Sequence, residues 1–217
     1  AVDVQHTMFC LLKKARIFRH RNLRKLDVLT LMITSLCLDL GHQGISNHHM
    51  IRTGHILALT YNDKSPNENM HASSIFHICL KEGCNLMELL STEEAKEFRN
   101  LIVTLILASD PSKYTTNLDA LILVMARHID EMQNGSDDEG DGNYSSSTKT
   151  RPSDSGSGFS KDSHPDGIAT ARPPPASLSG NDLMAVMMGL VLASDLGFCL
   201  KRPQQHIAWA RCLVEEH

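Results

Sequence analysis

Apolar residues recur every three or four positions along most of this chain, the spacing that places them on one face of an α-helix. The period is clearest at Leu26, Leu29, Ile33 and Leu36. The same spacing predicts further helices at 51–59, 72–79, 98–107, 118–129, 181–191 and 203–213. No segment alternates apolar and polar residues as a half-buried strand does. The pattern therefore predicts an all-α fold.

Three helix starts can be predicted from local chemistry. Ser91 and Glu94 form a capping box, in which each side chain can bond the other residue's backbone amide. Asn181-Asp182 is a candidate cap for the helix that follows, and Pro203 suits a first helical turn. The run 98–107 is apolar on nearly every side, so we expect that helix to be buried.

The stretch 133–179 breaks the helical pattern with Ser, Gly, Asp and Pro. Such a composition buries too little apolar surface to offset the entropy lost on ordering. We predict a long disordered insert inside one domain that spans 1–217, because helical spacing resumes after it. A tolerated surface insertion and a segment for phosphorylation or partner binding are the two alternatives.

Composition narrows the class of protein. Hydrophobic residues make up 41% of the 217, enough for a core, and the net charge of −4 favours neither nucleic acid nor an anionic membrane as a partner. The longest apolar run, 183–193, is too short for a membrane span. The six scattered cysteines include no CxxC pair, which predicts reduced core thiols and a cytoplasmic location. Helical patterns run into both ends, so we expect a piece of a longer protein.

Three carboxylates follow apolar helical runs: Asp39, Asp110 and Asp195. The C-terminal end of a helix carries partial negative charge and is a poor place for a bare anion. A bound divalent cation would offset that cost, as it does in helix-bundle metal sites. The alternative is that these acids cap loops or face water.

Other polar residues lie near these acids in the sequence. His42 is three residues after Asp39, a spacing that shares one helical face, and Gly44 permits a tight turn. Glu68 and His71 lie just before the predicted helix at 72–79. Together with the acids, they predict a shared site.

Several motifs occur in a familiar order: Cys37-Leu38-Asp39-Leu40-Gly41-His42 with Asn47, Tyr61-Asn62-Asp63, Asn67-Glu68-Asn69-Met70-His71, Leu107-Ala108-Ser109-Asp110 and Leu192-Ala193-Ser194-Asp195. In this order they resemble the class I 3′,5′-cyclic nucleotide phosphodiesterases, and most closely the high-affinity cGMP branch. The resemblance implies a multi-helix, HD-domain-like phosphodiesterase bundle and a cyclic nucleotide substrate.

The resemblance also implies the chemistry of the site. In that family one Zn²⁺ and one Mg²⁺ (or Mn²⁺) bridge a hydroxide that attacks the cyclic phosphate. Asp39 matches the bridging metal acid and Asp195 the late metal acid. The residues matched around them, which orient ligands and waters, are His42, Glu68, His71 and Asp110. Tyr61 and Asn47 match residues of the substrate pocket.

The chain departs from the family at important positions. Leu38 stands where the family has a metal-binding His, Gly41 replaces an acid and Met70 replaces a His. The general-acid motif would precede Ala1, and the purine-binding Gln would follow His217. We therefore predict weakened metal binding and little or no hydrolysis.

Three functions stay open at this stage. The first is a divergent phosphodiesterase; the second is an inactive relative that keeps a nucleotide pocket or a homodimer surface. The third is a helical interaction protein whose acids are incidental.

Overall fold

The computed structural model of the protein describes residues 2–14, 23–134, 178–197, 204 and 207. The chain divides into one unit of residues 1–126 and 177–217 and another of 127–176. In the second unit the described residues are the last turns of one helix, so the account below concerns the first.

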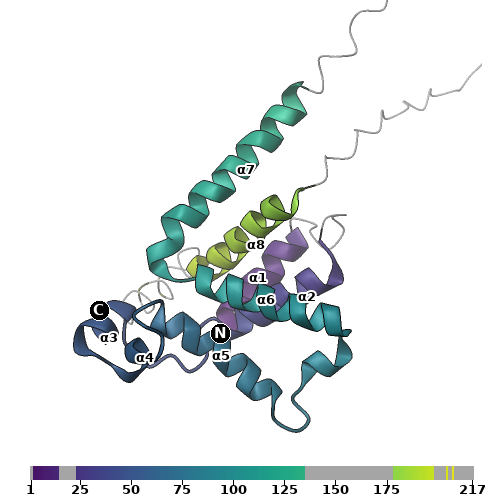
Figure 1. Cartoon of the computed structure of the whole chain (residues 1–217). Helices are drawn as coiled ribbons and strands as arrows, with labels where there is room; N and C mark the ends of the chain where they lie inside the picture. Colours follow the sequence, from purple (N-terminus) through teal and green to yellow (C-terminus); the bar gives the residue numbers. More distant parts are fainter. Residues whose placement is uncertain (1, 15–22, 135–177, 198–203, 205–206, 208–217) are drawn as a thin grey trace, which may run out of the picture. The chain divides into compact units, whose positions relative to one another are not determined.

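Helices form the described part of the chain, and no strand occurs in it, which confirms the predicted all-α fold (Figure 1). In chain order they are α1 (Val2–Lys14), α2 (Lys25–Cys37), α3 (Asn47–Thr53), α4 (Ile56–Thr60), α5 (Pro66–Cys79), η2 (Leu86–Leu89), α6 (Thr92–Ala108), η3 (Pro111–Lys113), α7 (Tyr114–Asn134) and α8 (Gly180–Asp195).

The start of α6 is the one that the sequence predicted. The Ser91 side chain accepts a hydrogen bond from the amide of Glu94, and the Glu94 carboxylate accepts one from the amide of Ser91. The start of α8 differs from the prediction. Ser179 caps that helix by accepting from the amide of Asp182, so the cap lies two residues before Asn181. Helix α8 begins at Gly180, so Asn181 lies inside the helix and does not cap it.

The predicted helix at 51–59 is two helices, α3 and α4. Gly54 ends α3 in the left-handed conformation, with φ of 64°, which a residue with a side chain rarely adopts. His55 then caps α4, because its ring nitrogen accepts from the amide of Leu57. A single left-handed glycine thus splits a continuous apolar period.

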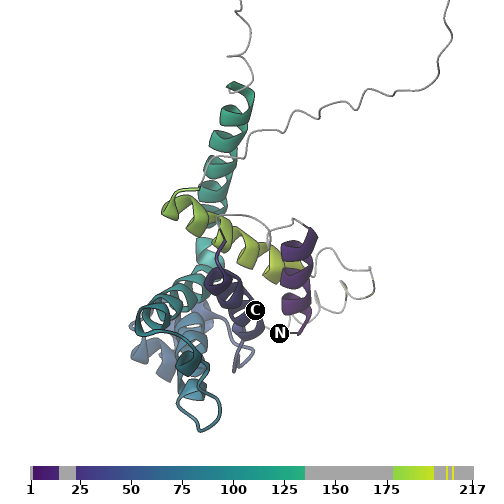
Figure 2. The same cartoon turned by 90° about the vertical axis from the view of Figure 1, so that its right-hand side faces the viewer.

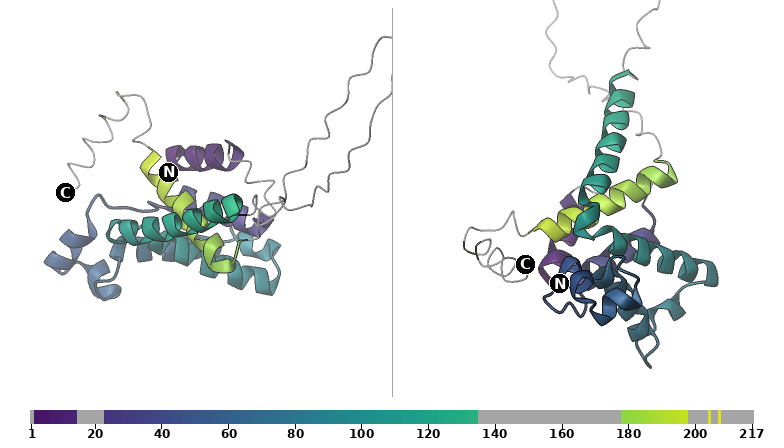
Figure 3. Two further views of the ribbon diagram at one scale, coloured as in Figure 1. Left: turned by 90° about the horizontal axis from the view of Figure 1, so that it is seen from above. Right: turned by 60° about the vertical axis from the view of Figure 1, so that its left-hand side comes forward.

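Helix α2 lies at the centre and packs against α1, α6 and α8 (Figure 2). One core cluster fills the space between these helices, and Figure 3 shows α1 and α8 lying together beside it. Its buried members are Val4, Met8, Leu12, Leu31, Leu38, Leu105, Met187 and Val191. Two parts of the chain that are far apart in the sequence, α1 and α8, therefore pack on each other and on α2.

A second core cluster joins α5 and α6 to the other face of α2. It contains Leu26 of α2, Ile75 of α5 and three residues of α6, Phe98, Ile102 and Ile106. The three α6 residues are fully buried, which confirms the burial predicted for 98–107.

Some predictions fall outside the described residues. They are the disorder of the insert over 135–177 and, apart from 204 and 207, the helix at 203–213. The predicted start of the insert at 133 is wrong, because α7 is helical to Asn134. The four described cysteines form no disulfide, but only Cys79 is buried and Cys84 is exposed, so the expectation of core thiols is wrong for Cys84. No helix among the described residues is long and apolar enough to cross a membrane.

Arg24 links the start of α2 to α6. Its guanidinium donates to both carboxylate oxygens of Asp27, at 2.7 and 3.1 Å, and to Glu97 of α6 at 3.0 Å. Asp27 is 1% exposed, so its carboxylate depends on these donors and on the amide of Arg24 at 2.8 Å.

We predict that Arg24→Ala lowers the free energy of unfolding by about 1–3 kcal/mol, because it leaves a buried carboxylate with one donor. Chemical denaturation measures the change. The control Glu97→Gln removes only the exposed ion pair between Arg24 and Glu97, and should lower the free energy of unfolding by no more than about 1 kcal/mol. Equal losses in the two variants would contradict this account.

Candidate functional site

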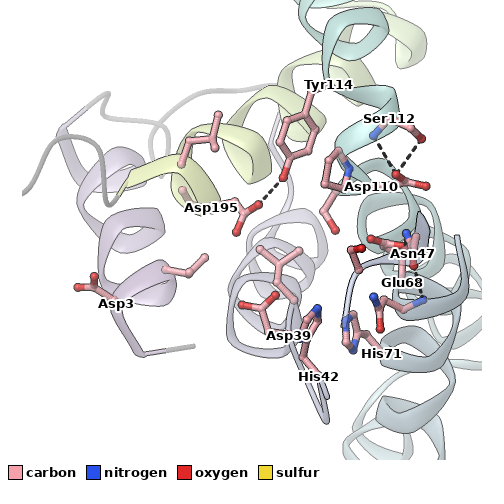
Figure 4. Close-up of a pocket in the computed structure, with 18 of the residues that line it drawn as sticks. Asp3, Asp39, His42, Asn47, Glu68, His71, Asp110, Ser112, Tyr114 and Asp195 are labelled. Carbon is pink, nitrogen blue, oxygen red and sulfur yellow. Dashed lines mark hydrogen bonds between the residues drawn. The ribbon is translucent and has the colours of Figure 1, made fainter. Parts of the chain in front are cut away.

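A cavity of about 590 Å³ opens between the end of α2, the start of α5, the α6–α7 turn and the end of α8 (Figure 4). This volume is typical of small-molecule sites. Seven of the eight residues predicted for the site line the cavity: Asp39, His42, Asn47, Glu68, His71, Asp110 and Asp195. Four separate segments of the chain thus bring the predicted residues together.

The segment after α2 turns sharply into the cavity. Helix α2 ends at Cys37, so Asp39 and His42 lie in a turn rather than on the shared helical face that their spacing predicted. The amide of His42 donates to the carbonyl of Asp39 at 3.1 Å. Gly41 and Gly44 have φ of 78° and 69°, so two left-handed glycines, and not Gly44 alone, make the turn.

Asn47 connects this turn to the start of α5. Its amide nitrogen donates to Glu68 at 2.8 Å, and its amide oxygen accepts from the backbone of Asn67 at 3.0 Å. Glu68 is 6% exposed. Burial raises the pKa of Glu68, and the bond from Asn47 acts in the opposite direction. Asn47 therefore positions a buried acid.

The two histidines predicted for the site stack on each other. The ring centroids of His42 and His71 are 5.6 Å apart and their planes meet at 27°. The Nδ1 atom of His71 lies 2.8 Å from the carbonyl oxygen of Leu40, which is a hydrogen bond when that nitrogen carries the proton. Burial lowers the pKa of His71, so the ring stays neutral to more acid conditions than usual.

Asp110 holds the turn between α6 and α7. Its carboxylate accepts from the Ser65 hydroxyl at 2.6 Å and from the amide and hydroxyl of Ser112 at 2.9 and 2.8 Å. Burial acts to raise the pKa of Asp110, but these hydrogen bonds outweigh it and the pKa is lowered. Asp110 is thus a loop-capping acid at the edge of the cavity, as one of the alternatives proposed.

Asp195, the last residue of α8, faces the cavity together with Asp39 (Figure 4). Burial raises the pKa of Asp195, and the charge of Asp39 adds to the rise. The hydroxyl of Tyr114 donates to Oδ2 of Asp195 at 2.6 Å. Burial and the Asp195 charge in turn raise the pKa of Tyr114, which keeps the phenol protonated. The sequence had not identified Tyr114. Its position four residues after Asp110, at the start of a helix, was the available signal.

Tyr61 does not line this cavity. Its hydroxyl lies 3.1 Å from that of Ser73 on α5. Its predicted contact with substrate stays a prediction.

Asp39 and Asp195, the two acids that the resemblance matched to metal ligands, both line the cavity. No set of three His, Cys, Asp or Glu side chains in the described part of the chain is arranged to hold a metal. Leu38, which borders the cavity, is 3% exposed and belongs to the core cluster of α1, α2 and α8. Two carboxylates fit a hard cation such as Mg²⁺, which takes oxygen ligands and keeps several waters. They do not supply the imidazole or thiolate ligands that Zn²⁺ prefers.

Comparisons with known proteins agree on one family. The sequence profile of the 3′5′-cyclic nucleotide phosphodiesterase family matches residues 1–217. The chain is 35% identical over 99 residues to the high affinity cGMP-specific 3′,5′-cyclic phosphodiesterase 9A of Pan troglodytes. The matched residues are 46% of this chain and 17% of that protein. It is 37% identical over 110 residues to the 3′,5′-cyclic-nucleotide phosphodiesterase regA of Dictyostelium discoideum. That match covers 51% of this chain and 14% of that protein.

A solved structure shows the same fold. The phosphodiesterase domain of the RhoPDE fusion protein from Salpingoeca rosetta matches with a TM-score of 0.68 and 27% identity. The match covers 99% of this chain and 53% of the solved chain. The chain thus spans less than a fifth of these curated relatives and about half of the solved domain.

We predict that His71 makes the protein less stable in acid. Because the folded pKa lies below the ordinary value of 6.5, the unfolded chain binds more protons, and the free energy of unfolding falls as the pH drops below 6.5. The slope from one histidine is at most about 1.4 kcal/mol per pH unit. Denaturation from pH 7.5 to 5.5 with a chelator present measures it.

The variant His71→Gln should flatten this slope. Replacing the exposed His49 by Gln is the matched control. If wild type and His71→Gln have the same pH dependence, burial of the ring is not its cause.

Proposed function

The chain belongs to the 3′,5′-cyclic nucleotide phosphodiesterase family, and we propose that its cavity binds a 3′,5′-cyclic nucleotide and serves its hydrolysis to the 5′-monophosphate. The observation that carries this proposal is the shared cavity of Asp39 and Asp195, two acids from the ends of different helices. The relatives are named for cGMP, for cAMP or for both, so the substrate proposed is the class as a whole.

Asp39 and Asp195 are the residues that would hold a divalent cation of the magnesium or manganese type. When bound, such a cation neutralises charge on the phosphoryl oxygens and lowers the pKa of a coordinated water. The two carboxylates line the same cavity, which supports this assignment. The zinc ion implied by the resemblance fits this chain less well, because Leu38 has no lone pair to donate.

The surrounding residues have positioning roles in this proposal. The stacked pair of His42 and His71 forms one wall of the cavity near Asp39. The neutral ring of His71 can exchange a proton with a water without adding a permanent positive charge. Glu68, held by Asn47, provides a buried acceptor on the opposite wall.

Leu38 is the reason to expect that hydrolysis by this chain is weak. Losing a residue that only orients a metal ligand typically costs ten- to a hundredfold in affinity, and losing a direct ligand costs more. A leucine between the core and the cavity preserves packing while it removes a donor. The alternative function, a nucleotide-binding module without catalysis, is favoured by the same observation.

We predict that Mg²⁺ or Mn²⁺ raises the melting temperature of the chain through Asp39. A cation at a hundred times its dissociation constant adds about 2.7 kcal/mol, or roughly 5–10 °C for a chain of this size. The variant Asp39→Asn should abolish the rise, and Asp119→Asn, which changes an exposed acid on α7, should retain it. A rise that survives Asp39→Asn would remove the proposed cation site.

We predict that the purified chain hydrolyses cGMP and cAMP little above background, and that Leu38→His raises the rate at least tenfold. The added imidazole restores a nitrogen donor beside Asp39, so Asp39→Asn in the Leu38→His background should remove the gain. Product formation followed by chromatography measures both. Rapid hydrolysis by the wild-type chain that Asp39→Ala abolishes would refute the impairment.

A further inference from the structure

We propose that Tyr114 is a positioning residue that holds Asp195 in the orientation in which it binds a cation. The inference rests on the proposed function, because it assumes that Asp195 is a cation ligand. It adds a residue that no motif of the sequence indicated, and it states what that residue does to the carboxylate.

The hydrogen bond between the two residues has one direction. An ionised carboxylate only accepts, so the phenol donates its single hydrogen to Oδ2 of Asp195, over 2.6 Å. Hydrogen bonds to a charged partner are short and strong, which restricts rotation of the carboxylate. With Oδ2 bonded to the phenol, Oδ1 is the oxygen of Asp195 that is left to bind a cation in the cavity.

Asp195 has a physical need for such a donor. It is the last residue of α8, where the helix carbonyls carry partial negative charge. Its neighbour Ser194 is turned away, because that hydroxyl donates to the carbonyl of Val191 at 2.8 Å. Asp39, across the cavity, repels it. Without the phenol, the Asp195 carboxylate would lose the hydrogen bond that restricts its rotation.

The turn that carries Tyr114 is itself well fixed. Asp110 caps the short helix η3, and the Lys113 ammonium donates to the carbonyl of Leu107 at 2.8 Å. Just beyond Tyr114, the side-chain amide of Asn117 donates to the carbonyl of Ala108 at 2.8 Å. These bonds tie the start of α7 to the end of α6. The phenol is therefore delivered from a rigid turn, and a rigid donor can orient an acceptor.

A side-chain contact between α7 and α8 lies along the same pair of helices. A Cβ atom added at Gly189 would lie 2.5 Å from a methyl carbon of Leu121, so the leucine side chain would have to move to admit it. Figure 4 shows the Tyr114 ring beside Asp195, with Asp39 on the other side of the carboxylate.

The test measures the affinity of the whole chain for Mn²⁺ alone, from the electron paramagnetic resonance signal of free Mn²⁺. We expect Tyr114→Phe, which keeps the ring and removes the hydroxyl, to weaken Mn²⁺ binding about tenfold. Thr60→Val removes an exposed hydroxyl that donates to the carbonyl of Ile56 outside the cavity lining, and should leave Mn²⁺ affinity unchanged. Circular dichroism melts first establish that each variant is folded.

A double-mutant cycle separates positioning from a general structural role. If Tyr114 acts through Asp195, Tyr114→Phe should change affinity by less than about twofold once Asp195→Asn is present. Two results would overturn this inference but leave the proposed function standing. One is wild-type Mn²⁺ affinity in Tyr114→Phe, and the other is an equal loss of Mn²⁺ affinity from Tyr114→Phe in the wild-type and Asp195→Asn backgrounds. If Asp39→Asn and Asp195→Asn bind Mn²⁺ as the wild type does, or the wild type binds none, the proposed cation site fails instead.

Discussion

Two carboxylates on one cavity set the main electrostatic constraint on this site. Asp39, in the turn after α2, is exposed, whereas Asp195 is the last residue of α8 and partly buried, and both lie at the negative end of a helix dipole. Burial is the main cause of the raised pKa of Asp195, and repulsion by the charge of Asp39 adds to it. A fold that keeps both acids on one cavity needs groups that offset this repulsion. The phenol of Tyr114 is one such group, and in the proposed function a divalent cation is the second.

The opposite wall of the cavity meets a related constraint with neutral donors. Glu68 and Asp110 are both nearly buried, and each accepts hydrogen bonds from uncharged side chains, Asn47 for the first and Ser65 and Ser112 for the second. Unpaired, a buried acid costs several kcal/mol, so these bonds are a condition for placing acids there. Asp195, Glu68 and Asp110 are therefore held in the same way, each by hydrogen bonds from uncharged neighbouring side chains.

Local chemistry explains which elements could be predicted from the sequence. The capping box at Ser91 and the buried face of α6 depend on residues three or four apart, and their predictions were right. The helix at α2 was also predicted, but its apolar period did not mark the buried face, because Leu29 and Leu36 are exposed. Where Gly54 divides α3 from α4, the period was unbroken, so hydrophobic spacing alone could not locate the break. The cap of α8 was misplaced by two residues because Ser, Asn and Asp all suit that role and packing selects among them.

Resemblance predicted seven residues that line one cavity, but their arrangement in it could not be predicted. Spacing placed Asp39 and His42 on a helix where the chain has a turn made by two left-handed glycines. Tyr114 was missed for a different reason. Its partner Asp195 is 81 residues away, and a hydrogen bond over that separation leaves no periodic or local trace in the sequence.

Leu38 contributes to the stability of the fold at the border of the cavity. The side chain packs with Met8, Leu31 and Val191 and at the same time borders the cavity. An imidazole at this boundary would need a hydrogen-bond partner or a metal to offset its burial, whereas a leucine gains about 1.5–3 kcal/mol from the same burial. In the proposed function, a leucine at position 38 therefore stabilises the core and supplies no ligand to the cavity.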